Sequence, residues 1–162
     1  MAIAITVRRA RQIDAGNVSA CLEAAFERYR PEYTCLAYEA TVLTPQEVRE
    51  RMQHMAVYMA SVPDMDVIAT LASSVEGKEG HLRGMAVLPA WQGHFIADHL
   101  LRVVEDDLAA AGCERLTLGT TLPLQRAIGF YRRNGFGPSG RVSDFHGMPL
   151  HEYSKRLSAR MR

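Results

Sequence analysis

A short polar stretch in front of a strongly apolar one could bind an anion. Gln92, Gly93 and His94 precede an apolar pattern that predicts a helix over 96–111. The first turn of a helix has backbone N–H groups without partners and carries the positive end of the helix dipole. Gly93 has no Cβ, so a phosphate could approach these groups closely. An ordinary loop with one glycine would have the same sequence pattern, so this segment alone does not distinguish an anion-binding site from a loop.

Other polar patterns in the chain do not support metal or nucleophile chemistry. His94 and His99 are five residues apart, so on a helix they lie on different faces and form a poor metal pair. His151 and Glu152 lack the second histidine of a zinc-protease helix. The segment 137–140 is not a Gly-x-Ser-x-Gly nucleophile elbow. We therefore expect no metal.

Composition limits the class of protein. The 162 residues are 48% hydrophobic and 23% charged, which is typical of one globular domain that spans residues 1–162. The net charge of +1 argues against a nucleic-acid partner, and no apolar run approaches the ~20 residues that cross a membrane. Charges follow the apolar N-terminal stretch, which is the wrong order for a secretory signal.

The cysteines indicate a reducing compartment. Cys21, Cys35 and Cys113 are an odd, scattered set with no C-x-x-C pair, which favours a cytoplasmic protein without disulfides. None of them has a histidine nearby in the sequence, so we do not expect a covalent acyl-cysteine route.

The periodicity of apolar residues predicts an α/β (α+β) fold. Strand patterns occupy residues 3–7, 57–62, 67–75, 81–88, 115–120, 137–144 and 150–157. Helical patterns occupy residues 14–30, 44–55, 96–111 and 123–134, with Asp14 and Thr44 as caps and Pro31 ending the first, whereas 32–43 is irregular. The helix 96–111 and its two flanking strands should form a right-handed, parallel βαβ unit. We expect a mixed, mostly antiparallel sheet flanked by helices and splayed at this unit.

Two motifs in residues 80–136 resemble those of the GNAT superfamily of acyl-CoA N-acyltransferases. The first is Gln92-Gly93-His94-Phe95-Ile96-Ala97, which is similar to the family's phosphate loop Gln/Arg-x-x-Gly-x-Gly/Ala. The second and more specific one runs from Ala127 to Phe136 (AIGFYRRNGF) and is similar to the family's Ala-x-x-Phe-Tyr-x-x-x-Gly-Phe. The resemblance implies a GNAT-like fold and acetyl-CoA as co-substrate.

The resemblance also implies binding roles. The cofactor would contact Met85, Ala86, Val87, Gln92, Gly93, His94, Phe95, Ile96, Ala97, Leu124, Ala127, Phe130 and Tyr131. Backbone N–H groups near Ala86 and Val87 would hold the thioester and the pantetheine arm, and the start of the helix would hold the pyrophosphate. Arg132 and Arg133 could reach the phosphates, or could only favour the end of their own helix.

Two residues are predicted to move protons. Tyr131 lies where relatives place a general acid for the departing thiolate, and a phenol with a pKa near ~10 is protonated at neutral pH. The alternative is a buried aromatic residue on a helix face. His81 lies where some relatives carry a glutamate base, and its pKa near ~6.5 suits removal of the amine's proton. The alternative is an exposed histidine after a turn; Glu79 and Glu39 are weaker candidates.

Two positions depart from the family's pattern. Phe95 occupies the place of a glycine, so its side chain needs room, and Leu124 occupies the place of an asparagine that often contacts the cofactor. The lost polar contact is typically worth about 0.5–1.5 kcal/mol.

The favoured function is therefore an N-acetyltransferase in which an amine attacks acetyl-CoA directly. The rival is a non-catalytic acyl-CoA-binding regulatory module of the same fold. The acceptor, a small-molecule or peptide amine, would lie between segments 30–43 and 143–149, and the family is compatible with a homodimer.

Overall fold

The computed structural model describes residues 4–157. Ile3, the first residue of the strand predicted over 3–7, and the basic C-terminal end beyond 157 lie outside this range. In chain order the elements are β1 (Thr6–Arg9), α1 (Ala15–Phe26), α2 (Cys35–Thr41), α3 (Pro45–Arg51), β2 (Ala56–Val62), β3 (Met65–Glu76), β4 (Glu79–Val87), α4 (Ile96–Ala110), β5 (Arg115–Thr120), α5 (Gln125–Arg133), β6 (Gly137–Phe145) and β7 (Met148–Arg156).

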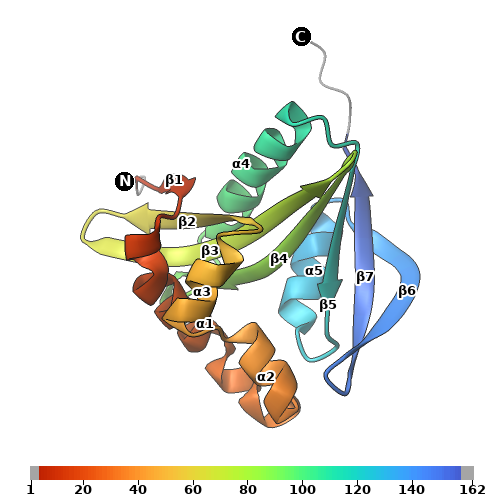
Figure 1. The fold of residues 1–162 in the computed structure, drawn as a ribbon, viewed down its shortest axis with the longest axis horizontal. Helices are drawn as coiled ribbons and strands as arrows, with labels where there is room; N and C mark the ends of the chain where they lie inside the picture. Colours follow the sequence, from red (N-terminus) through yellow and green to blue (C-terminus); the bar gives the residue numbers. More distant parts are fainter. Residues whose placement is uncertain (1–3, 158–162) are drawn as a thin grey trace.

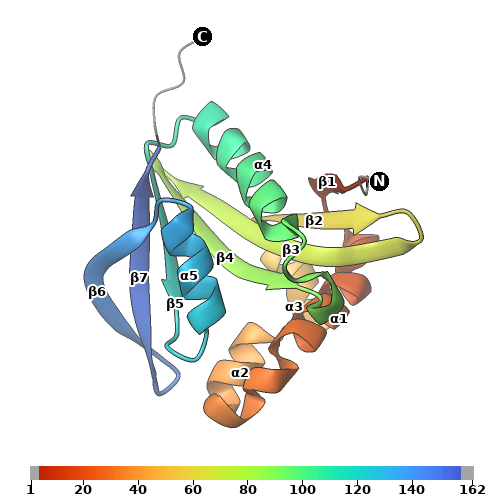
Figure 2. The ribbon, with the colours of Figure 1, turned by 180° about the vertical axis from the view of Figure 1, so that it is seen from behind.

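The strands form one sheet with the order β1-β2-β3-β4-β5-β7-β6. Neighbouring strands are antiparallel except β4 and β5, which are parallel and are connected through α4. Helices α1, α2 and α3 lie on one face of the sheet, and α4 and α5 lie on the other (Figures 1 and 2). The predicted fold class, a mixed and mostly antiparallel sheet flanked by helices with a central βαβ unit, is confirmed.

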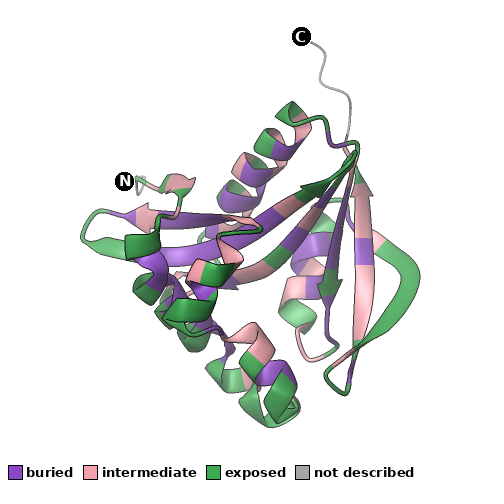
Figure 3. Ribbon diagram, in the orientation of Figure 1, coloured by how far each residue is buried: buried purple, intermediate pink, exposed green. Residues whose placement is uncertain are grey.

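Most residues of the central strands are buried (Figure 3), and apolar side chains pack on both faces of these strands. Leu100 and Val104 of α4 are fully buried against one face, as the helical spacing predicts. On the other face Val18 and Leu22 of α1 pack with Met59 of β2. Each such side chain contributes about 1.5–3 kcal/mol by leaving water. Because both faces are covered, the central strands are held firmly enough to position a site.

The two parallel strands separate part-way along their length. They pair only from Glu79 and Arg115 to Leu82 and Leu118, and beyond these residues they diverge (Figure 1). The divergence coincides with a shift in the β3–β4 register and with Gly84, whose φ of 69° is in the left-handed region. A bulge of this kind bends its strand. The bend leaves the rest of β4 without a strand partner on the β5 side, and the predicted splay is present.

The first helix differs from its prediction at both ends. The Asp14 side chain does not cap it; the carboxylate accepts hydrogen bonds from the Arg8 guanidinium at 2.9 Å and from the Arg11 backbone N–H at 2.8 Å. The charged partner offers a stronger interaction than a helix amide. The helix ends at Phe26, and Pro31 lies inside a following 3₁₀ helix rather than ending the α-helix. Proline cannot sit in an α-helix interior, so the chain tightens one turn earlier.

Other boundaries were shifted by a few residues. The predicted capping box at Thr44 and Glu47 is confirmed, with hydrogen bonds of 3.0 and 3.2 Å, but α3 ends at Arg51 rather than near 55. The segment predicted as irregular contains the regular helix α2. Helix α5 begins at Gln125 rather than at Pro123, because residues 121–124 form a turn. None of the helices within residues 4–157 combines the length and apolar character needed to cross a membrane.

Candidate active site

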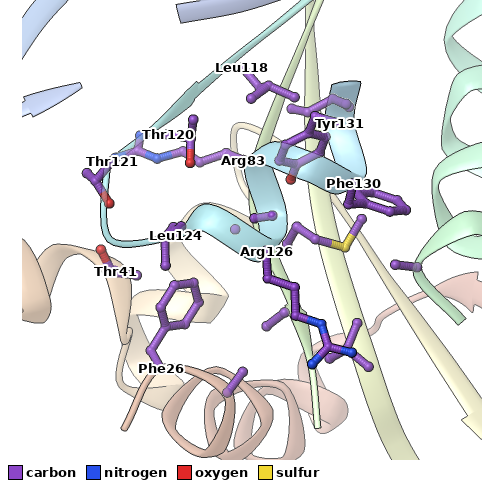
Figure 4. Close-up of a pocket in the computed structure, with 18 of the residues that line it drawn as sticks. Phe26, Thr41, Arg83, Leu118, Thr120, Thr121, Leu124, Arg126, Phe130 and Tyr131 are labelled. Carbon is purple, nitrogen blue, oxygen red and sulfur yellow. The ribbon is translucent and has the colours of Figure 1, made fainter. Parts of the chain in front are cut away.

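A cavity of about 480 Å³ occupies the splay between β4 and β5 (Figure 4). Helices α4 and α5 contribute to one side of it, and residues of α1, α2 and α3 contribute to the other. The predicted site residues that line it are His81, Met85, Ala86, Val87, Gln92, Gly93, Phe95, Ile96, Ala97, Leu124, Ala127, Phe130 and Tyr131. His94 does not line it, because its side chain is exposed and packs on Trp91 with the ring centroids 5.7 Å apart.

The entrance of α4 presents backbone N–H groups to this cavity. Phe95 precedes the helix with a φ of 60°, and its side chain makes no capping hydrogen bond. The N–H groups of residues 95–98 have no hydrogen-bond partner among the described residues. Gly93, with a φ of 84°, adopts a conformation that any other residue would adopt only with strain. Such a run of free amides at a helix start is suited to an anion.

The side chain of Phe95 is directed to solvent. It is 79% exposed, although it also lines the rim of the cavity. The room that its side chain was expected to need is therefore available outside the helix entrance. Its left-handed backbone costs about 1–2 kcal/mol relative to an ordinary conformation.

Two arginines that the sequence analysis did not select lie beside this entrance. A Cβ on Gly93 would lie 3.6 Å from Nη2 of Arg126, the second residue of α5. Nη2 of Arg28 donates to Oε1 of Gln92 at 3.0 Å, and Nε2 of Gln92 donates to the carbonyl of Val87 at 3.1 Å. These contacts hold the loop against β4 and against the 3₁₀ helix that follows α1. They also place positive charge where an anion would approach.

Of the two arginines that were considered for the phosphates, one lines the cavity. Arg133 is part of the lining, whereas the Arg132 guanidinium lies over the ring of Tyr153, 5.7 Å from its centroid.

Tyr131 is enclosed by aromatic rings. Its centroid lies 5.3 Å from that of Phe130 and 5.6 Å from that of Phe136, and the residue is 6% exposed. The hydroxyl points into the cavity (Figure 4) and has no hydrogen-bond partner among the described residues. Burial raises the pKa of Tyr131 above its ordinary value. The phenol is therefore protonated at neutral pH and is free to donate to a group in the cavity.

His81 lies half-buried on β4 and lines the cavity from that strand, whereas Tyr131 lines it from α5. Its Nδ1 is 2.9 Å from Oγ1 of Thr117, the residue opposite it on β5. Burial, together with the positive charge of Arg83, lowers the pKa of His81 below its ordinary value. The imidazole is therefore neutral at pH 7 and can accept a proton.

The weaker candidates for a base are placed less favourably. Oε2 of Glu79 is held by Nη1 of Arg115 at 2.7 Å, and Glu39 is exposed on α2. Neither residue lines the cavity. Among the three candidates, His81 alone does so.

The three cysteines are free, and none of them lines the cavity. Burial raises the pKa of Cys21 to about 12 and also raises the pKa of Cys113, so both thiols are unreactive. Within residues 4–157 no group of three or more His, Cys, Asp or Glu side chains is arranged to hold a metal ion.

Comparison with known proteins decides the family. The sequence profile of the acetyltransferase (GNAT) family matches residues 19–136. The chain belongs to the GNAT family. A curated relative, an IAA acetyltransferase of Azospirillum brasilense, is 34% identical over 80 residues, or 49% of this chain. The chain matches only about half of that protein's length (52%).

Solved structures share the fold of this GNAT chain at low sequence identity. PaiA N-acetyltransferase of Thermoplasma acidophilum in complex with coenzyme A has a TM-score of 0.79 at 16% identity, covering 96% of this chain and 100% of that one. The ribosomal-protein-S18-alanine N-acetyltransferase of Escherichia coli has a TM-score of 0.77 at 15% identity, covering 96% and 95%. These likenesses establish the fold alone.

The GNAT chain offers a fitting cradle for coenzyme A. The free amides of residues 95–98 and the guanidinium of Arg126 suit a pyrophosphate, and the apolar walls formed by Met85, Ala127 and Phe130 suit a pantetheine arm. Arg126 could not be selected from the sequence, because 33 positions separate it from Gly93 in the chain. Its position in the first turn of the helix that carries Tyr131 was the one available signal.

Proposed function

We propose that the chain transfers the acetyl group of acetyl-CoA to an amine by direct attack. The observation that carries this proposal is a single cavity with free helix amides and Arg126 at one end and the unpaired hydroxyl of Tyr131 in its wall. Acetyl-CoA is a thioester whose carrier bears a pyrophosphate. Transfer of its acetyl group requires an anion-binding end and a proton donor in the same cavity.

Acetyl-CoA would supply an acetyl group activated as a thioester. The residues of the chain would then do the remaining work. His81 accepts the proton that the amine must lose as its nitrogen–carbon bond forms. Tyr131 donates its proton to the sulfur as the carbon–sulfur bond breaks. N–H directions alternate along β4, and the N–H of Leu88 donates to Ile68 of β3, so the N–H of Ala86 also points to β3. The N–H of Val87 is on the side of β4 that faces the splay and stabilises negative charge on the thioester oxygen.

A single domain over residues 1–162 and a cytoplasmic location belong to the same proposal. The free cysteines are compatible with a reducing compartment.

Thiol release tests the function. The chain is incubated with acetyl-CoA and a panel of primary amines, and free thiol is followed against a control without amine. We expect amine-dependent release of thiol in stoichiometric amounts with acetylated amine. Binding of coenzyme A without release on any amine would overturn the enzymatic function.

That second outcome would favour the rival, a non-catalytic acyl-CoA-binding regulatory module. Leu124 favours this rival, because it lines the cavity with an apolar side chain at the position where the family often has an asparagine that contacts the cofactor. The absence of a thermal shift with millimolar coenzyme A would contradict both functions.

A further inference from the structure

The cavity wall carries much more positive than negative charge. Five arginines line it: Arg28, Arg51, Arg83, Arg126 and Arg133. Of the carboxylates within the described residues, only Asp98 is part of the lining. The phosphates of coenzyme A would account for the cations near the entrance of α4. Arg51 and Arg83, on α3 and β4, remain to be explained.

Arg51 is a half-buried cation without an anionic partner. It forms no ion pair and no side-chain hydrogen bond within the described part of the chain. Glu47, one turn earlier on α3, is the nearby acidic group that acts on it, but the Glu47 carboxylate accepts from the backbone N–H of Thr44. Burial, with a further contribution from Arg83, lowers the pKa of Arg51 to about 10, so the guanidinium is still charged at neutral pH.

The backbone opposite Arg51 is shaped to admit the guanidinium. A Cβ on Gly84, the bulge residue of β4, would lie 2.7 Å from Nη1 of Arg51. Any larger residue at position 84 would displace the arginine. Two features of the chain, a glycine bulge and the last residue of α3, thus combine to hold at the cavity one guanidinium that forms no ion pair within residues 4–157.

The neighbouring wall supports recognition of a polar ligand. Arg83 is exposed, lines the same cavity and forms no ion pair among residues 4–157. Thr41 and Thr121 also line the cavity, and the Thr121 hydroxyl is 2.7 Å from the hydroxyl of Tyr33. Thr41 is the last residue of α2 and Thr121 directly follows β5, and both belong to the cavity lining (Figure 4).

We propose that the acceptor is a primary amine that also carries a carboxylate, and that Arg51 binds this carboxylate. The inference rests on the proposed acetyl transfer and names the class of its substrate. An anion restores the charge balance that the lining lacks, and guanidinium–carboxylate pairing in a partly dry site is strong. The same positive charges disfavour a second cation, so polyamines are excluded as preferred acceptors.

The arrangement also assists the chemistry. An amine bound beside Arg83 and a neutral His81 lies near a positive charge, which favours its uncharged form. Only the uncharged amine can attack. Recognition of the carboxylate would therefore depend on Arg51, and activation of the amine on Arg83.

Matched pairs of amines test the proposal. Free-thiol release is measured for L-methionine against 3-(methylthio)propylamine, L-phenylalanine against phenethylamine, and L-glutamate against 4-aminobutyrate against propylamine. In the first two pairs only the α-carboxylate differs. The last series removes first the α-carboxylate and then the distal carboxylate. We expect kcat/KM to be at least 10-fold higher for the carboxylated member of the best pair.

Arg51→Met provides the decisive variant. It should lower kcat/KM for the preferred amino acid about 10- to 100-fold, mainly through KM of the acceptor, and leave the decarboxylated amine and KM of acetyl-CoA unchanged. Arg49→Met is the matched control: Arg49 lies at the same end of α3, does not line the cavity and contacts Gln46. A role of Arg51 in favouring that helix end alone would predict equal effects of both variants. Thermal unfolding of each variant confirms that it is folded.

Each outcome separates the inference from the function on which it rests. Turnover without preference for the carboxylated amines, or an Arg51→Met enzyme with unchanged preference, overturns the carboxylate proposal and leaves acetyl transfer intact. If no amine is acetylated, thermal shifts of the CoA-saturated protein are measured with the same pairs. Stabilisation by the carboxylated members alone, lost in Arg51→Met, would support the binding site while the enzymatic function fails. Stabilisation by neither would overturn both.

Discussion

Replacement of Tyr131 by phenylalanine separates catalysis from folding in this chain. The ring packs between Phe130 and Phe136, so Tyr131→Phe keeps every aromatic contact. The hydroxyl has no partner among the described residues, and its removal breaks no hydrogen bond of the folded chain. Because the hydroxyl faces the cavity and is not among the buried polar atoms that lack a partner, the variant should be as stable as the wild type to within about 1 kcal/mol.

The effect on catalysis should be large in comparison. A positioned general acid typically contributes 10²–10⁴-fold. A thiolate with an ordinary pKa near ~8.5 is a moderate leaving group, so we expect the lower end, a decrease of about 100-fold in kcat, or about 2.7 kcal/mol. Burial raises the pKa of Tyr131, so the acid form is retained as pH rises and is lost only above that raised value. Tyr131 should therefore cause no fall in wild-type kcat between pH 7 and about 10.

The assay is steady-state thiol release at saturating acetyl-CoA, with the Kd of coenzyme A measured by calorimetry. Tyr153→Phe is the control, because Tyr153 is also 6% exposed but does not line the cavity. We expect Tyr131→Phe to lose kcat with an unchanged Kd, and Tyr153→Phe to keep both. A Tyr131→Phe enzyme with more than a third of the wild-type kcat would refute the reasoning, because the sulfur would then leave without this phenol.

Three further predictions concern the helix entrance and the base. Gly93→Ala combines a φ of 84° with a Cβ 3.6 Å from Arg126, so it should cost about 1–2 kcal/mol of stability and weaken coenzyme A binding at least 10-fold by calorimetry. Gly112→Ala, with a φ of 95° and open space around it, should cost similar stability without changing Kd; an equal loss of binding in both would count against an anion site at Gly93. Phe95→Gly should raise the melting temperature by removing left-handed strain of about 1 kcal/mol, and should retain coenzyme A binding; a lower melting temperature would contradict this account. The pKa of His81 is lowered below 6.5, so a plot of log kcat/KM against pH should have a slope of 1, due to the amine, above pH 6.5 and a slope of 2 only below it. In His81→Gln the slope should stay at 1 throughout. A slope that still rises to 2 in this variant would exclude His81 as the base.

Contacts that are local in the chain could be predicted from the sequence. The motif around Tyr131 places Phe136 five residues later in the chain, directly after a glycine, and the two rings pack with their centroids 5.6 Å apart. Gly135, with a φ of 92°, makes the turn that returns the chain. Five residues and one glycine determine this geometry, so no knowledge of the tertiary fold is needed. The capping box at Thr44 was predictable for the same reason.

Contacts between distant segments could not be predicted in this way. Arg126 reaches Gly93 only because α5 and the loop before α4 lie on the same side of the splay. Arg51 and Gly84 meet only after α3 packs beside the bulge of β4. In both cases the sequence shows an ordinary arginine near a helix end, for which a solvated position is the commoner outcome. The tertiary fold, rather than any local pattern, determines which of the arginines face the cavity.

Of the two positions that depart from the family's pattern, only Leu124 still favours the non-catalytic binding module. Phe95 was a reason to doubt cofactor binding, yet its side chain is 79% exposed and leaves the amides of residues 95–98 without a covering group among the described residues. Leu124 adds apolar wall where polar contact is absent, which weakens binding by no more than one hydrogen bond. A module that only bound coenzyme A would need the entrance of α4 and the apolar walls. It would have no need of an unpaired arginine held against a glycine bulge on the opposite side of the splay, since no part of the coenzyme needs a second anion site there. The charge on Arg51 therefore favours a second ligand beside the coenzyme, which the Arg51→Met comparison tests, whereas amine-dependent thiol release distinguishes an acetyltransferase from a binding module.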